Sequence, residues 1–190
     1  MAFTFSPSRG HRHLLDVLPG FTGTIVTDGH GAYTKFLRQV EAVEHAQCWT
    51  HTRREFVKAE KAEPDAVAEA LSLMGVLYRV ETAIGQQGLT DAAKREYRQS
   101  HAKPAVDAFF AWCEAQCQRM DLTPSDMLSK ALKYARKREA NLRRFGLRPS
   151  SLCLEVTETK IMRSPEQAER TMDGSAVCPC DHSAGILGAS

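Results

Sequence analysis

The sequence feature that most constrains the fold is a short β-branched run that ends on an acidic residue and a glycine turn. Thr24–Thr27 reads Thr-Ile-Val-Thr and is followed by Asp28-Gly-His-Gly. Ile and Val are stiff at χ1 and pack well on a pleated sheet, so the run predicts a strand. α/β enzymes hold a carboxylate at the carboxyl end of such a strand, within reach of a metal ion or a phosphate group. Asp28 is therefore our first candidate catalytic residue, and the other interpretation is a turn aspartate before glycine.

The next segments predict that this strand belongs to a β-α-β unit. From Gly31 to Val40, apolar residues recur at i, i+3, i+4 and i+7, which is the pattern of a helix with one buried face. Val40 to Ala46 is the candidate for the second strand. Thr50 is expected to cap a further helix, which carries Arg53, Arg54 and Lys58 on its polar side.

The pair Cys48 and His51 has the spacing of two soft metal ligands on neighbouring turns. A zinc site uses four protein ligands, or three and a water molecule, so the pair is a weak metal candidate and we expect no bound metal. Cys113 and Cys117 share an apolar helical stripe, which favours buried thiols. Ligand-type residues recur in a tail without periodicity, as Cys178-Pro-Cys180-Asp-His182.

The segment from Pro64 to Phe145 is predicted to be helical almost throughout. The first helix carries one apolar stripe and is expected to end at Gly85-Gln-Gln-Gly88. A short charged helix over Asp91–Gln99 and a separate helix opened by Pro104 are expected next. A last helix is expected to begin at Thr123-Pro-Ser-Asp and to run to Phe145, and this arrangement predicts a helical subdomain.

Charge is distributed unevenly along the chain. The formal net charge of +2 does not by itself indicate nucleic-acid binding, but residues 130–148 hold eight basic residues and one acidic residue. Anionic partners, DNA above all, are expected for this segment; the alternative is an ordinary solvated helix face. The candidate DNA-contacting residues are Arg53, Arg54, Lys58, Lys130, Lys133, Arg136 and Lys137. No long apolar run and no signal peptide are seen, so we expect a cytoplasmic protein without a membrane span.

Residues 3 to about 145 resemble the transposases of the insertion-sequence sixty-six family. The motifs that carry the resemblance are Arg9, Gly23, Thr27-Asp28-Gly29-x-x-x-Tyr33, Cys48-Trp49-x-His51-x-Arg53-Arg54-x-Phe56, Leu77-Tyr78-x-x-Glu81, Pro124-Ser125-x-x-x-x-Lys130-Ala131-x-x-Tyr134 and Leu142-x-x-Phe145. The resemblance implies a ribonuclease-H-like catalytic domain with a DDE carboxylate triad, in which Asp28 is the second carboxylate. It also implies Mg²⁺ as cofactor, DNA element ends as substrate, and cleavage and transfer of DNA strands as the activity.

The chain departs from the family pattern at the other two triad positions. The family places one carboxylate upstream of the segment that matches Phe3-Thr4-Phe5, and the other in an Asp-Asn-Asn and Glu-Arg stretch after Phe145, which this sequence lacks. Two-metal phosphoryl transfer needs several negative ligands to hold both ions. We therefore expect the chain to be catalytically inactive and to bind no Mg²⁺ on its own.

Gly146 to about Asp173 resembles an internal piece of an EAL-type cyclic-di-GMP phosphodiesterase, in which Glu155 has the position of a metal ligand. The Glu-Ala-Leu signature upstream and the Asp-Asp-Phe-Gly signature downstream are absent, so Glu155 and Glu158 are expected to be solvent-facing remnants. The tail after Gly174 is expected to be disordered or the product of a frame shift.

Together these patterns predict a helix-rich α/β chain, built from an incomplete ribonuclease-H-like β-α-β fragment and a helical subdomain. The predicted segments are 1–62 and 63–145 for the transposase, 146–174 for the EAL-like piece and 175–190 for the tail. The expected function is that of a DDE transposase fragment. Two alternatives remain: a phosphodiesterase remnant, or a helical interaction protein that binds full-length transposase and inhibits it.

Overall fold

The computed structural model describes residues 2–4, 12–144, 151–155 and 187–189 of the 190-residue chain. The chain divides into two compact units. One unit, here named the sheet unit, comprises Met1–Ala46 and Ser150–Ser190, and the other, the helical unit, comprises Gln47–Pro149. The predicted class, α/β and rich in helix, is confirmed, whereas the division at residues 62, 145 and 174 stays a prediction.

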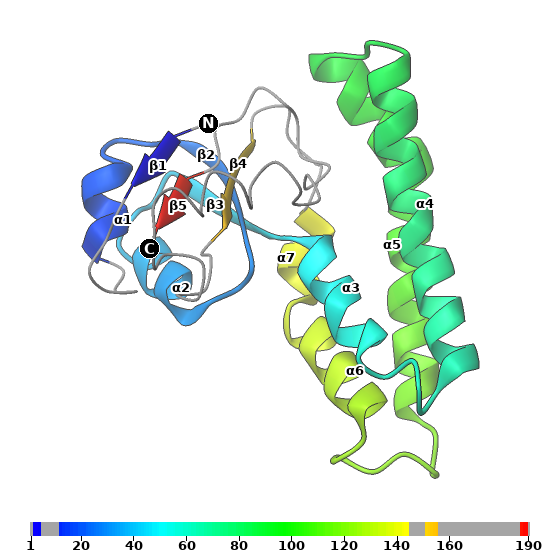
Figure 1. Ribbon diagram of the computed structural model, residues 1–190. Helices are drawn as coiled ribbons and strands as arrows, with labels where there is room; N and C mark the ends of the chain where they lie inside the picture. The colour runs from blue at the N-terminus through cyan, green and yellow to red at the C-terminus, as the bar shows by residue number, and fades with distance from the viewer. Residues whose placement is uncertain (1, 5–11, 145–150, 156–186, 190) are drawn as a thin grey trace, which may run out of the picture. The chain divides into compact units, whose positions relative to one another are not determined.

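The strands of the sheet unit form one five-stranded sheet in the order β1-β5-β4-β2-β3 (Figure 1). Its described strands are β1 (Ala2–Thr4), β2 (Gly23–Thr27), β3 (Val43–Gln47), β4 (Ser151–Glu155) and β5 (Leu187–Ala189). The pairs β1 with β5, β4 with β5 and β2 with β4 are all parallel. The sheet therefore joins strands from both ends of the sequence.

A small apolar core packs around β2 in the sheet unit. The helices are α1 (Arg12–Val17) and α2 (Gly31–Leu37), and the core residues are Leu14, Leu18, Ile25, Tyr33 and Phe36. Ile25 and Phe36 are fully buried, as the strand and helix patterns predicted. The predicted β-α-β unit is thus confirmed, with the helix ending at Leu37 and the second strand beginning at Val43.

The helical unit is built on a long helical hairpin. Helices α4 (Pro64–Gln86) and α5 (Asp91–Cys117) lie side by side along their length (Figure 1). Gly88 makes the turn between them at φ 61°, a conformation that glycine adopts without steric cost. Helices α3 (Trp49–Val57), α6 (Met127–Lys137) and α7 (Glu139–Arg144) complete the unit.

Aromatic side chains form the centre of the helical core. Phe109 is packed edge-on against Trp49, Phe56 and Phe110, with ring centroids 5.2, 5.6 and 5.2 Å away, and it stacks on Trp112 at 6.2 Å. Offset and edge-to-face contacts at these distances are the favourable arrangements of aromatic pairs. The cluster joins α3 to α5, and apolar residues of α4, α6 and α7 surround it.

The prediction of two separate helices within Asp91–Cys117 was wrong, because α5 is a single helix. Pro104 lies inside one continuous helix of 27 residues rather than at the start of a second one. An internal proline removes one hydrogen bond and costs about 3 kcal/mol or more. Packing offsets that cost, because α5 is held against α4 on both sides of Pro104, by Arg98 toward its start and by Phe109 and Cys113 toward its end.

Two predicted helix boundaries were also wrong. Cys48, not Thr50, is the N-cap of α3, and the Thr50 hydroxyl instead lies 3.3 Å from the hydroxyl of Tyr78 on α4. The last predicted helix is interrupted at Arg138, whose ψ of 6° separates α6 from α7. The first change brings the Thr50 side chain into a tertiary contact that sequence periodicity does not report.

Several sequence-based predictions fall outside the described residues, namely those on Arg9, Phe145, Glu158, Cys178, Cys180 and His182. The alternating residues from Ser151 form the strand β4, and a short strand, β5, follows near the end of the chain. Among the helices that the structure describes, none is both long enough and apolar enough to cross a membrane.

Candidate functional site

Asp28 follows directly on the last residue of β2 and shapes the loop that leads into α2. Its Oδ1 accepts a hydrogen bond of 2.7 Å from the backbone N–H of His30, which closes an Asx turn. Gly29 lies between them at φ 82°. Asp28 therefore has the strand-end position expected of a catalytic carboxylate and also the local contact expected of a turn residue.

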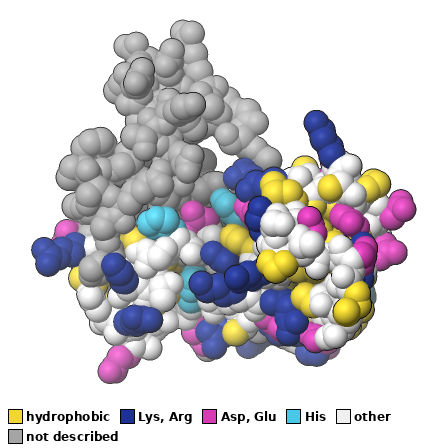
Figure 2. Space-filling model, turned by 90° about the horizontal axis from the view of Figure 1, so that it is seen from below, with side chains coloured by type: hydrophobic (Ala, Val, Ile, Leu, Met, Phe, Trp, Pro, Cys, Tyr) yellow, Lys and Arg dark blue, Asp and Glu magenta, His cyan; other side chains and the backbone are white. Residues whose placement is uncertain are grey.

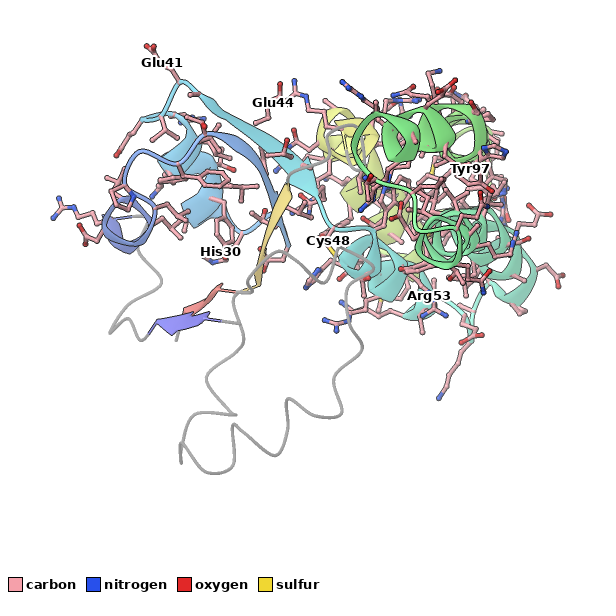
Figure 3. The ribbon with its side chains drawn as sticks, turned by 90° about the horizontal axis from the view of Figure 1, so that it is seen from above. His30, Glu41, Glu44, Cys48, Arg53 and Tyr97 are labelled. Carbon is pink, nitrogen blue, oxygen red and sulfur yellow. The ribbon has the colours of Figure 1, made fainter. Side chains whose placement is uncertain are left out.

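Three further polar residues fix this loop, and none of them was predicted from the sequence to be functional. The buried Oγ1 of Thr27 accepts a hydrogen bond of 3.1 Å from Gly29 N–H and lies 2.7 Å from Nε2 of His45 on β3. His30, labelled in Figure 3, caps α2, and its Nδ1 accepts a hydrogen bond from Ala32 N–H at 3.3 Å. The one sequence signal for them was the position of His30 directly before a predicted helix.

The sheet brings the end of β4 to the same edge as Asp28. In the parallel pair, Val26 of β2 is opposite Cys153 of β4. If this register continued for two more residues, it would set Asp28, the first residue after β2, level with Glu155, the last residue of β4. The two resemblances assigned these residues to unrelated segments, so neither could suggest that their backbones are neighbours.

The described residues do not fit the two-metal site that the family resemblance implies. Among them, no group of three or more Cys, His, Asp or Glu side chains is placed to hold a metal ion. Two-metal chemistry needs several anionic oxygen ligands around both ions, and one oxygen of Asp28 is engaged by the backbone of its own loop.

Cys48 and His51 lie at the start of α3 in the helical unit. Cys48, labelled in Figure 3, is buried, forms no disulfide and stands at the N-cap position of α3, where its side chain makes no capping hydrogen bond. His51 lies in the first turn of the helix, three residues further on. Within the described part of the chain, the pair belongs to no larger cluster of metal-binding side chains.

The basic residues of α3 differ in their surroundings. Arg53 and Arg54 are exposed, and Figure 3 shows Arg53 pointing outward from the helix. Neither has an acidic partner among the described residues. Lys58 instead forms an ion pair of 2.6 Å with Glu55. Arg53 and Arg54 are thus better placed than Lys58 to meet an anion.

The basic residues of α6 lie opposite its apolar face. Lys130, Lys133, Arg136 and Lys137 are exposed, while the buried side of the helix carries Leu128, Ala131, Leu132 and Ala135. On the face shown in Figure 2, Lys and Arg side chains occur with Asp and Glu side chains among them. Arg136 is paired with Glu114 of α5 at 2.7 Å. The positive surface is therefore partly neutralised by acidic neighbours.

A pocket of about 520 Å³ lies between the end of α5 and α6. Its walls combine apolar residues, hydroxyls, one thiol and four cationic side chains. The lining residues are Gln116, Cys117, Arg119, Leu122, Thr123, Pro124, Ser129, Leu132, Lys133, Arg136 and Lys137. All of them belong to the helical unit, and we name this pocket the α5–α6 groove.

The two cysteines of α5 are expected to differ in reactivity. Burial raises the pKa of the Cys113 thiol to about 12, whereas Cys117 is exposed. The thiolate is the nucleophile, so iodoacetamide at mildly alkaline pH should modify Cys117 and leave Cys113 unmodified in the native protein. Peptide mass spectrometry after a short labelling time checks this. Equal labelling of both residues would contradict the packing of Cys113.

Comparison with known proteins identifies the class. A family model of transposases matches residues 1–151, which is most of the chain. The chain therefore is a transposase-related protein, and within that class it belongs to the Transposase IS66 family. The predicted resemblance of residues 3 to about 145 to this transposase family is thereby confirmed.

One relative of the chain has a name that gives no function. This uncharacterized protein y4qI of Sinorhizobium fredii is 27% identical over 152 residues. The match covers 76% of this chain and 28% of the relative, so the chain spans less than a third of that protein's length. No solved structure matches the chain significantly.

Proposed function

We propose that the chain represents part of the catalytic region of an insertion-sequence transposase, with a ribonuclease-H-like sheet in which Asp28 is a metal-binding carboxylate. The observation that carries the proposal is the position of Asp28 at the carboxyl end of a buried parallel strand. Ligands of open α/β sheets bind at that edge. Two contacts that fix the loop around Asp28 support the assignment: the hydrogen bond between Thr27 and His45, and the cap that His30 forms on Ala32 N–H.

The 190-residue chain by itself is proposed to lack strand-cleavage and strand-transfer activity. One aspartate cannot hold two ions, and the family resemblance assigns no other carboxylate of the sequence to the triad. Mg²⁺ is the cofactor expected of the intact family, and the chain alone is proposed not to retain it.

DNA is the proposed partner, bound through its phosphate backbone. The residues proposed to contact it are Arg53, Arg54, Lys58, Lys130, Lys133, Arg136 and Lys137. Such contacts are independent of sequence and position the duplex by charge. The exposure of these side chains supports the assignment.

A chimera gives the sharpest test of the role of Asp28. Residues 1–151 of this chain would replace the matching segment of an active full-length transposase of the family, and transposition frequency would be scored. We expect activity in the chimera and a fall to background with Asp28→Asn, because the amide cannot supply an anionic ligand. Thr4→Val, a change in a different strand, is the control and should leave activity in place. A chimera that tolerates Asp28→Asn would rule out a catalytic role for Asp28.

The isolated chain tests the proposed inactivity. Purified protein would be incubated with labelled element ends and Mg²⁺, alongside Asp28→Asn and Glu155→Gln. We expect no product above background in any of the three. Products that disappear in Asp28→Asn would show that the chain completes a site, and their loss in Glu155→Gln as well would identify Glu155 as the second carboxylate.

A further inference from the structure

We propose that the α5–α6 groove binds the phosphate backbone of DNA and that bound DNA covers the thiol of Cys117. The choice of DNA as the partner rests on the proposed function. The groove adds the location of the contact, and Cys117 adds a chemical reporter of DNA binding. Of the proposed DNA-contacting residues, three line this one groove, namely Lys133, Arg136 and Lys137.

The cations around the groove are not equally available to an anion. Arg119 is bound by Glu63 at 2.9 Å and by Asp121 at 2.6 Å, and these two carboxylates balance its charge. Arg136 is balanced by Glu114. By contrast, Lys130, Lys133 and Lys137 are exposed and have no carboxylate partner among the residues that the structure describes. The three lysines therefore carry the uncompensated positive charge of this surface.

The spacing of the three lysines matches a nucleic-acid backbone. They occupy positions i, i+3 and i+7 of α6, so they share one side of the helix. At a rise of 1.5 Å per residue the row is about 10 Å long, and one strand of a duplex presents a phosphate about every 3.4 Å of helix axis. The row is thus long enough to face about three successive phosphates.

Arg136 also connects the two walls of the groove. Its guanidinium group contacts both the thiol of Cys117 and the carboxylate of Glu114, and the two contacts raise the pKa of Arg136. These contacts join α6 to the end of α5, which are the two walls of the groove. Ser129 adds a hydroxyl group to the lining, which can donate a hydrogen bond to a phosphate oxygen, whereas the Thr123 hydroxyl already donates to Asp126.

Cys117 makes binding at the groove measurable. It is exposed and lies in the groove wall, whereas the other cysteines with a described environment, Cys48 and Cys113, are buried. A neutral reagent such as N-ethylmaleimide would label Cys117 in the full chain, with and without a duplex of unrelated sequence. Peptide mass spectrometry reads each cysteine separately. We expect the duplex to slow labelling of Cys117 in proportion to the fraction of protein bound.

The decisive variant removes two of the three lysines. In Lys133→Gln/Lys137→Gln the slope of log Kobs against log salt should become less steep by about 1.8, which is 0.9 for each lost phosphate contact, and protection of Cys117 should disappear. The matched control is Arg79→Gln/Arg95→Gln, which removes two exposed positive charges from the opposite end of the α4–α5 hairpin. The control should keep the wild-type slope and the protection.

The outcomes separate this inference from the proposed function. DNA binding with an unchanged slope in the lysine variant, or without protection of Cys117, would overturn the groove and leave DNA as the partner. Absence of any salt-sensitive DNA binding by the full chain would overturn both. If polyglutamate at the same concentration of negative charge protected Cys117 as well as the duplex does, the groove would be a surface for any polyanion. That result would also overturn the groove as a DNA site.

Discussion

Replacing Phe109 with alanine is expected to lower the free energy of unfolding of the helical unit by about 3–5 kcal/mol. Phe109 is 1% exposed and makes ring contacts with four aromatic side chains from two helices. Removing the ring leaves a cavity that rigid neighbours cannot fill, and it also removes edge-to-face contacts worth about 0.5–1.5 kcal/mol each. The expected loss is large compared with the total stability of a typical domain.

Urea denaturation monitored by tryptophan fluorescence measures this effect directly. Both tryptophans of the chain, Trp49 and Trp112, touch the Phe109 ring, so the signal reports the unit in which the change is made. Phe109→Leu is the matched control, and it should lose clearly less stability because it keeps most of the buried volume. A loss below about 1 kcal/mol for the alanine variant would contradict the observed packing.

Replacing Arg98 with alanine is expected to destabilise the helical unit by about 3–5 kcal/mol. Arg98 on α5 makes two hydrogen bonds to Glu81 on α4, with Nε to Oε1 at 2.8 Å and Nη2 to Oε2 at 2.6 Å. The two side chains are 9% and 12% exposed. Alanine at position 98 would therefore leave the Glu81 carboxylate with little access to water and without the Arg98 guanidinium. An uncompensated buried charge of this kind is strongly destabilising.

Two controls separate the charge effect from packing. Arg98→Met combined with Glu81→Leu removes both charges and keeps the volume, so it should recover most of the stability lost in Arg98→Ala. Lys103→Ala breaks an exposed pair with Asp107 on the same helix, and it should change stability little. Chemical denaturation of the three variants and the wild type checks the pattern. Similar losses in Arg98→Ala and in the double variant would mean that packing, not charge, is the source.

The parts of the fold that were predictable depend on local patterns. The β-branched run at Thr24–Thr27 and the apolar stripe of α4 each predict, from one segment alone, which residues are buried. The predicted strand and the predicted helix are both confirmed. Pro104 shows the limit of such reasoning. Its effect on a helix depends on what the helix packs against, and α4 supplies that support from a separate segment.

The candidate site was predictable to the same extent. The strand-end position of Asp28 followed from the run before it, whereas its contact with His30 and the bond between Thr27 and His45 depend on loop and cross-strand geometry. The pairing of β2 with β4 depends on residues far apart in the chain, so no sequence window contains it. Likewise, charge alone could not show that Arg136 is paired with Glu114 while Lys133 has no described acidic partner.

The sheet unit is discontinuous in sequence, and this has a consequence for how the protein forms during synthesis. Its central pair joins β2 to β4, and the whole helical unit lies between these strands in the chain. Residues 47–149 can leave the ribosome and reach a stable helical core while β2 still lacks a neighbour on that side. Local helical contacts form quickly, whereas distant parallel pairing is slow. Until Ser151–Glu155 arrives, the nascent chain exposes a bare strand edge and is most vulnerable to proteases and to association with other chains.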